Sequence, residues 1–195
     1  MKYLVLVLTR SAGICTLESI MNVEDFHLLR FGESMKDNFP AEASMAMDRE
    51  TPKEIGLADA LWNTSSLLVV SDKFKSILEG IPGALQENEI LSVKIINHKG
   101  RPVKDPYFII HQLENPPAVD ETKTKGRRSK LAPDTYQFID KMVLDVGKVP
   151  KDRMLFRAKQ FTEAVFIRSD LAEKLEPLGL TGFEMREIDE HEWDA

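Results

Sequence analysis

The chain contains a single cysteine, Cys15, so it cannot form an internal disulfide, and this usage is typical of a reducing compartment. It also lacks any apolar run near the roughly 20 residues that a membrane-spanning helix needs. The apolar stretch at residues 4–8 is too short for the core of a signal peptide, and no small-residue cleavage pattern follows it. We therefore expect a cytoplasmic protein with no membrane partner.

The motifs of common enzyme and metal sites are also missing. The sequence contains neither the glycine-rich loop that cradles phosphates nor the G-x-S-x-G turn of a serine nucleophile. Its four histidines are scattered, and none stands at metal-ligand spacing from another or from the cysteine: His27, His98, His111 and His191. We expect no metal, no cofactor and no catalytic residue.

An excess of basic residues is missing as well. The net charge is −6, whereas a general nucleic-acid binder needs a basic face to displace counterions. Nucleic acid is therefore not the expected partner. The length of 195 residues suffices for one well-buried domain or for two small lobes that share a core, and we expect a single domain over residues 1–195.

What the sequence does contain is one pattern that occurs twice, at residues 67–96 and 164–188. Each copy runs from an apolar stretch through a Ser-Asp pair, a helical pattern and two glycines into a second strand. A serine there accepts a hydrogen bond from the first helical turn, and an aspartate beside it interacts favourably with the helix dipole. We therefore interpret Ser71 and Ser169 as helix caps rather than nucleophiles.

These two units predict an α+β fold, with a mixed or mainly antiparallel sheet and short helices. Alternation of apolar and polar residues predicts a strand at 91–95, and a hairpin is expected from 153–158 and 164–168. Residues 136–144 fit either a helix or a strand.

A further helix is predicted from Thr51 to Trp62. Thr51 is followed by Pro52 and by Glu54, which together form the capping pattern of a helix start.

A basic segment lies within residues 114–134, which we predict to be a mobile, solvated loop. Arg127 and Arg128 would let it dock a phosphate or an acidic partner. One alternative function is therefore a nucleic-acid-associated protein that uses the loop at 123–130. Against it, no aromatic residue within that loop offers a base a stacking platform.

A second alternative is a small hydrolase or transferase that uses His111 with a distant carboxylate. His111 closes an apolar strand at 107–112 and would serve as a general base. The simpler interpretation, which we favour, is a histidine packed at the boundary of the core.

The sequence closes with an acidic segment at residues 184–194. Such a segment would occupy the basic cleft of a partner, or it is an ordinary charged terminus. A tryptophan flanked by charge is a plausible contact anchor. The predicted partner-binding residues combine this tail with the basic loop: Glu187, Asp189, Glu190, Glu192, Trp193, Arg127 and Arg128.

The order of these features resembles the eleventh-numbered immunity family of bacterial polymorphic toxin systems, a domain long filed as of unknown function. The likeness rests on an N-terminal strand, on the first Ser-Asp unit, on a later strand pair that enters the second unit, and on a closing Thr-Gly-Phe. These lie at residues 3–6, 67–78, 155–157, 165–170 and 180–184. It covers most of the chain, and the region 10–60 matches only loosely.

This resemblance implies a non-catalytic immunity protein that binds and neutralises a cognate bacterial toxin or effector in the producer's cytoplasm. Its partner would be that toxin or effector protein, and self-association is left open. The resemblance supplies no catalytic residue and no contact residue to carry over.

Overall fold

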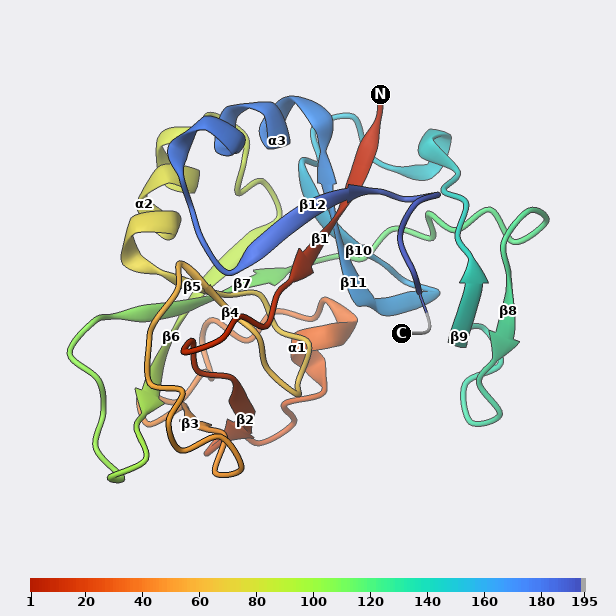
Figure 1. Cartoon of the computed structure of the whole chain (residues 1–195). Helices are drawn as coiled ribbons and strands as arrows, with labels where there is room; N and C mark the ends of the chain where they lie inside the picture. Colours follow the sequence, from red (N-terminus) through yellow and green to blue (C-terminus); the bar gives the residue numbers. More distant parts are fainter. Residues whose placement is uncertain (194–195) are drawn as a thin grey trace.

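Two β-sheets, of six and four strands, make up most of the fold, and a two-stranded hairpin lies beside them (Figure 1). The computed structural model describes residues 1–193, so Asp194 of the predicted acidic tail lies outside the described residues. Strands outweigh helices, which confirms the predicted α+β class with mixed sheets and short helices.

The six-stranded sheet has the order β2-β3-β6-β7-β5-β4. Its neighbours pair antiparallel except β3 and β6, which are parallel. The strands are β2 (Leu17–Met21), β3 (Ser44–Met47), β4 (Ala60–Leu61), β5 (Val69–Ser71), β6 (Asn88–Ile96) and β7 (Tyr107–Gln112).

The four-stranded sheet has the order β10-β11-β1-β12 and is antiparallel throughout. Its strands are β1 (Tyr3–Leu8), β10 (Leu155–Ala158), β11 (Phe161–Arg168) and β12 (Phe183–Glu187). The predicted hairpin from 153–158 and 164–168 is confirmed as β10 and β11.

The helices are short, and within residues 1–193 none is long and apolar enough to cross a membrane. They are α1 (Leu28–Phe31), α2 (Asp72–Gly80), α3 (Ser169–Leu175) and the 3-10 turns η1 (Val146–Lys148) and η2 (Glu176–Leu178).

The two copies of the repeated pattern share one topology. In the first, β5, α2 and β6 follow one another, and β5 and β6 both pair antiparallel with β7, which lies between them. In the second, β11, α3 and β12 follow one another, and β11 and β12 flank β1 in the same way. Each copy is thus a strand-helix-strand unit whose two strands are separated in the sheet by a third strand, β7 in the first copy and β1 in the second. This confirms the predicted pair of related units.

The helix starts of the two units differ. Phe74 N donates to Ser71 Oγ at 3.2 Å, so the predicted cap of α2 is confirmed. The predicted cap at Ser169 is wrong, because the N-cap residue of α3 is Arg168 and no side chain caps it. Ser169 is already helical, and its backbone N–H donates to Lys2 O at 3.0 Å. A backbone contact beside β1 therefore sets where α3 begins.

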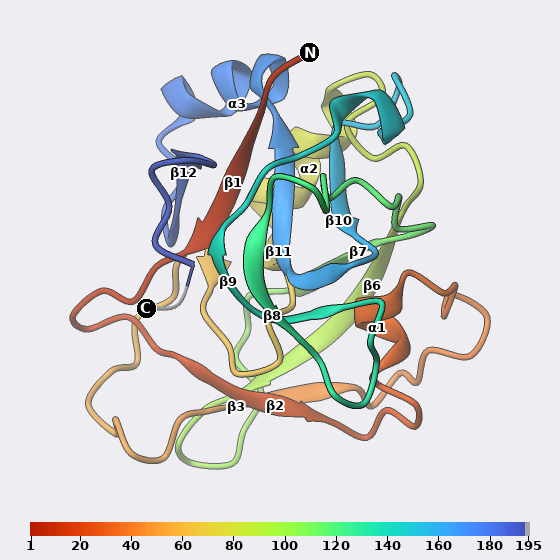
Figure 2. The same ribbon diagram turned by 90° about the vertical axis from the view of Figure 1, so that its right-hand side faces the viewer.

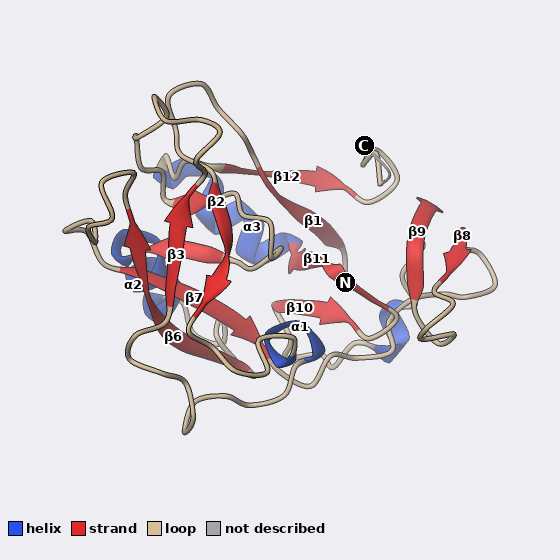
Figure 3. Ribbon diagram, turned by 90° about the horizontal axis from the view of Figure 1, so that it is seen from below, coloured by secondary structure: helices blue, strands red, loops and turns tan. Residues whose placement is uncertain are grey.

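Three apolar clusters lie on and between the sheets. Alternate residues of β1 serve two of them: Leu6 packs between the sheets, whereas Tyr3 and Val5 pack on the outer face of the four-stranded sheet. Burial on both faces explains the unbroken apolar run of β1. The cluster between the sheets also takes the apolar faces of α2 and α3, and the remaining cluster covers the far face of the six-stranded sheet. Seen from below, the six-stranded sheet, the four-stranded sheet and the hairpin follow one another (Figure 3).

The helix predicted from Thr51 to Trp62 is wrong. Glu54 N donates to Thr51 O at 3.0 Å and closes only a turn. The next residues pair elsewhere, because Gly56 N donates to Gly13 O at 2.8 Å and Cys15 N donates to Gly56 O at 2.9 Å. A Cβ added at Gly56 would lie 2.6 Å from the carbonyl oxygen of Gly13. A long-range backbone contact therefore overrides the local capping signal.

The segment at 136–144 and the basic loop form the third sheet. Residues 136–141 are a strand, β9 (Tyr136–Lys141), which pairs with β8 (Lys125–Arg128). The predicted loop at 114–134 therefore contains a strand and is not irregular throughout. Ile139 and Met142 pack into the outer cluster of the four-stranded sheet, and the hairpin lies over β11 in Figure 2.

Candidate functional site

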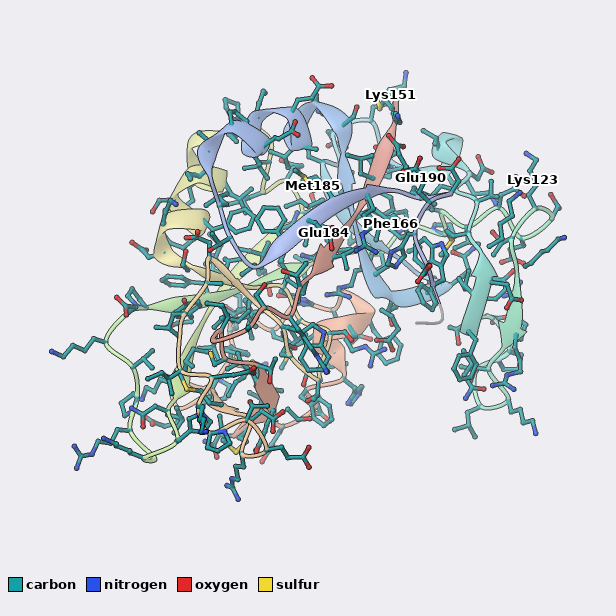
Figure 4. The ribbon with its side chains drawn as sticks, viewed as in Figure 1. Lys123, Lys151, Phe166, Glu184, Met185 and Glu190 are labelled. Carbon is teal, nitrogen blue, oxygen red and sulfur yellow. The ribbon has the colours of Figure 1, made fainter. Side chains whose placement is uncertain are left out.

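The predicted acidic tail begins on the outer strand of the four-stranded sheet. Glu187 closes β12, and its carboxylate lies 2.6 Å from Lys2 Nζ. Hydrogen bonding and charge attraction from Glu187 raise the pKa of Lys2, and the carboxylates of Asp189 and Glu190 add to that rise. Asp189 and Glu190 lie in the turn beyond the strand and are exposed, as is Glu192. Figure 4 shows Glu184 on β12 and Glu190 past its end.

The tail folds back onto the sheet at Trp193. The indole ring packs against Phe161 and Phe166, with ring centroids 5.9 and 6.2 Å away, and its Nε1 donates to Ile188 O at 3.2 Å. The ring is therefore half-buried rather than freely exposed as a contact anchor would be. It fastens the acidic segment to the sheet.

A groove of about 500 Å³ runs between α3 and β12. Its floor is apolar and includes Leu4, Leu175 and Met185. Its rim carries four glutamates: Glu173, Glu176, Glu184 and Glu187. Of these four, only Glu187 is among the residues predicted to contact a partner.

The charges on this rim are only partly neutralised. Glu184 pairs with Arg186 at 2.6 Å, and Glu187 pairs with Lys2. Glu173 and Glu176 are exposed and enter no ion pair within residues 1–193. Their spacing of three residues on the second helical pattern is a signal that could have found them, because such residues share one helix face.

The predicted basic residues lie on the hairpin, away from the groove. Arg128 is engaged locally: its Nη2 lies 2.9 Å from Glu121 Oε2, and its guanidinium lies 4.1 Å from the centre of the Tyr136 ring. Arg127 is exposed and lies over the ring of Phe138 at 4.4 Å. The aromatic partner that the basic loop lacked in the sequence thus comes from the paired strand β9. The structure does not bring these arginines together with the tail acids.

His111 is closed off from solvent. Its side chain is 1% exposed, and Nε2 donates to Glu33 O at 2.8 Å. Burial lowers its pKa, and the nearby carboxylate of Glu89, its cross-strand partner, opposes that effect. Met35 N donates to that carboxylate at 3.1 Å. Glu89 is half-buried, but the imidazole of His111 is withheld from solvent, which counts against a hydrolase or transferase that uses this histidine as its general base.

The thiol of the single cysteine is also withheld from solvent. Cys15 is buried, and burial raises the pKa of its thiol to about 11, which disfavours the nucleophilic thiolate. Within residues 1–193, no group of three or more histidine, cysteine, aspartate or glutamate side chains is placed to hold a metal ion.

A second groove, of about 460 Å³, lies where β1 and β11 approach the segment after β4. Both tryptophans of the chain, Trp62 and Trp193, line it. The Arg10 guanidinium lies 3.5 Å from the centre of the Trp62 ring, so one of these rings is already covered by a cation of the same chain.

Two comparisons with known proteins bear on this arrangement. Residues 12–190 match a family model described as "Immunity protein family (Imm11)". No curated protein matches the chain.

Proposed function

The chain belongs to the immunity protein family Imm11, and on that basis we propose that it binds and neutralises a cognate bacterial toxin or effector in the cytoplasm of the producing cell. The match over residues 12–190 is the observation that carries this proposal. It spans both strand-helix-strand units and the strand β12 that closes the second.

Neutralisation proceeds by stoichiometric binding that blocks the active site of the toxin or the access of its substrate. The burial of His111 and Cys15 supports this mode, because these two reactive side chains are withheld from a ligand.

The exposed acids of the tail supply the proposed contact. Asp189 and Glu190 lie side by side in the turn after β12, close enough to Lys2 to raise its pKa. A toxin with a basic surface would be attracted to this side of the molecule, which accelerates association. The hairpin arginines Arg127 and Arg128 lie apart from this contact, and Trp193 contributes by holding the tail on the sheet.

The test uses the product of the adjacent gene as the partner. Its toxin domain, inactivated so that it can be produced, is co-expressed with the chain carrying an affinity tag. We expect a stable complex that co-purifies, and we expect the chain to protect cells that express the active toxin. If no complex forms at micromolar concentration and the cells are not protected from the toxin, the proposal is contradicted.

A further inference from the structure

The groove between α3 and β12 combines an apolar floor with a charged rim. Leu175 forms its buried floor, whereas Leu180, Phe183 and Met185 are only half-buried. A partner that covers these side chains removes apolar area from water, which stabilises the complex. The groove therefore offers a partner apolar contacts as well as charge.

The glutamates on the rim of the groove favour a partner that carries positive charge. Glu173 and Glu176 stand on one wall, and Glu184 stands on β12 opposite them. At the end of the groove, Lys2 is outnumbered by Glu187 and by the neighbouring tail acids, whose charges all raise its pKa. A cationic segment meets attraction along the whole groove, whereas an acidic or neutral one gains no such pairing.

The strand β12 adds a third feature, which is an open edge. It is the outermost strand of the four-stranded sheet, and no strand pairs with its outer side within residues 1–193. Glu184, Arg186 and Glu187 place charged side chains along this strand, and charged side chains on an edge strand discourage edge-to-edge pairing with another sheet. The edge thus disfavours a second copy of this chain and tolerates a basic partner.

We propose that the α3–β12 groove is the surface on which the toxin docks, through a cationic segment that places apolar side chains on Met185 and Leu180 and Lys or Arg side chains against the glutamate rim. This inference rests on the proposed function and names its contact surface. The groove between the two tryptophans is the weaker candidate, because the Arg10 guanidinium and the folded tail already occupy its aromatic faces.

The experiment compares two charge-reversed chains that carry the same net charge. The groove variant combines Glu173→Lys with Glu176→Lys. The control combines Glu24→Lys with Glu50→Lys, which change exposed residues flanking the β2 and β3 strands of the other sheet. We expect the groove variant to raise the Kd for the purified toxin domain by at least about tenfold, and the control to change it by less than about twofold.

Hydrogen exchange on the unmutated complex supplies a measurement that does not depend on a variant. Binding should slow amide exchange in α3 and β12 while leaving the hairpin β8–β9 unchanged. A complex that forms with both elements unprotected, or with protection confined to the two-tryptophan groove, overturns the docking surface and leaves the toxin-binding function intact. A dimer of the free chain whose contact covers β12 also overturns it. Failure of the unmutated chain to bind any toxin overturns the function and the groove together.

Discussion

Asp59 and Thr181 are joined by three hydrogen bonds although they lie 122 residues apart. The Thr181 hydroxyl donates to Asp59 Oδ2 at 3.1 Å and accepts from Asp59 N at 3.1 Å, and Thr181 N donates to Oδ2 at 3.0 Å. The other carboxylate oxygen, Oδ1, accepts from Ser71 Oγ at 2.9 Å. One aspartate thus ties the capped start of α2 to the turn that leads into β12, and so links the two repeated units.

The glycine that follows this threonine is expected to be irreplaceable. Gly182 has φ of 87°, and a Cβ there would lie 1.9 Å from Ala60 O. Gly182→Ala should therefore lower the free energy of unfolding by about 3 kcal/mol or more, since strain and steric overlap add. Gly179→Ala is the matched control, with φ of 60° and no atom within 4 Å of its Cβ, and should cost about 1 kcal/mol. Urea unfolding measures both, and equal losses would contradict the packing argument.

The two serines of the repeat should respond differently to the same substitution. Ser71→Ala removes the side-chain oxygen that accepts from Phe74 N and should lower the free energy of unfolding by about 1 kcal/mol. Ser169→Ala removes no cap and should change it by less than about 0.5 kcal/mol. Thermal or urea unfolding of the two variants decides the matter, and a similar loss in both would show that Ser169 also caps its helix.

Arg157 joins the two sheets in the interior and is 1% exposed. Its guanidinium donates to Gln112 Oε1 at 2.9 Å, to Ser66 O at 2.6 Å and to Thr162 O at 2.5 Å. Arg157→Met leaves these three acceptors without their donor, so we expect a loss of about 3 to 5 kcal/mol in unfolding free energy. The exposed Arg127→Met is the control and should change it by less than about 0.5 kcal/mol. A stable Arg157→Met protein would show that water or a neighbour replaces the guanidinium.

Burial of His111 should make stability depend on pH. Its folded pKa lies below the ordinary value of 6.5, so as the pH falls the unfolded chain binds this proton first. The free energy of unfolding should therefore decrease as pH falls from about 6.5 towards the lowered pKa. Burial lowers the pKa of His191 as well, which acts in the same direction.

The variant His111→Gln should flatten this dependence between about pH 7 and 5, and a second change, His191→Gln, should flatten it further. The exposed His27→Gln serves as the control. Urea unfolding across this pH range measures the slope, and an unaltered slope in the double variant would assign it to other groups.

Charge reversal in the tail should slow association with the toxin. Glu187 is already paired with Lys2, so the informative change is Asp189→Lys with Glu190→Lys, which alters the exposed acids alone. We expect the association rate constant to fall by about tenfold at low salt and its dependence on ionic strength to weaken. Stopped-flow mixing with a labelled toxin domain measures both. Unchanged rates and an unchanged salt slope would place the contact elsewhere.

Short sequence patterns predicted most of the individual strands of this fold and the capped start of α2. The alternation of apolar residues predicted β6, and the Ser-Asp pairs marked both strand-helix-strand units, although Ser169 does not cap its helix. Such signals are encoded within a few residues. The helix expected from Thr51 failed because Gly56 is held against Gly13, a contact that no short window contains. The groove could not be predicted from the sequence because it also depends on long-range contacts. Glu173 and Glu176 become part of one site with Glu184 only after α3 packs across β1.

The position of β1 between β11 and β12 has a consequence for how the protein is made. During synthesis β1 emerges before either neighbour, and both of its edges stay unpaired until the far end of the sequence has left the ribosome. Long-range pairing of this kind is slow, and an apolar strand waiting for it is prone to aggregate. The four-stranded sheet, and with it the α3–β12 groove, therefore closes last. A chain interrupted before β12 would therefore be an aggregation-prone fragment that lacks the α3–β12 groove.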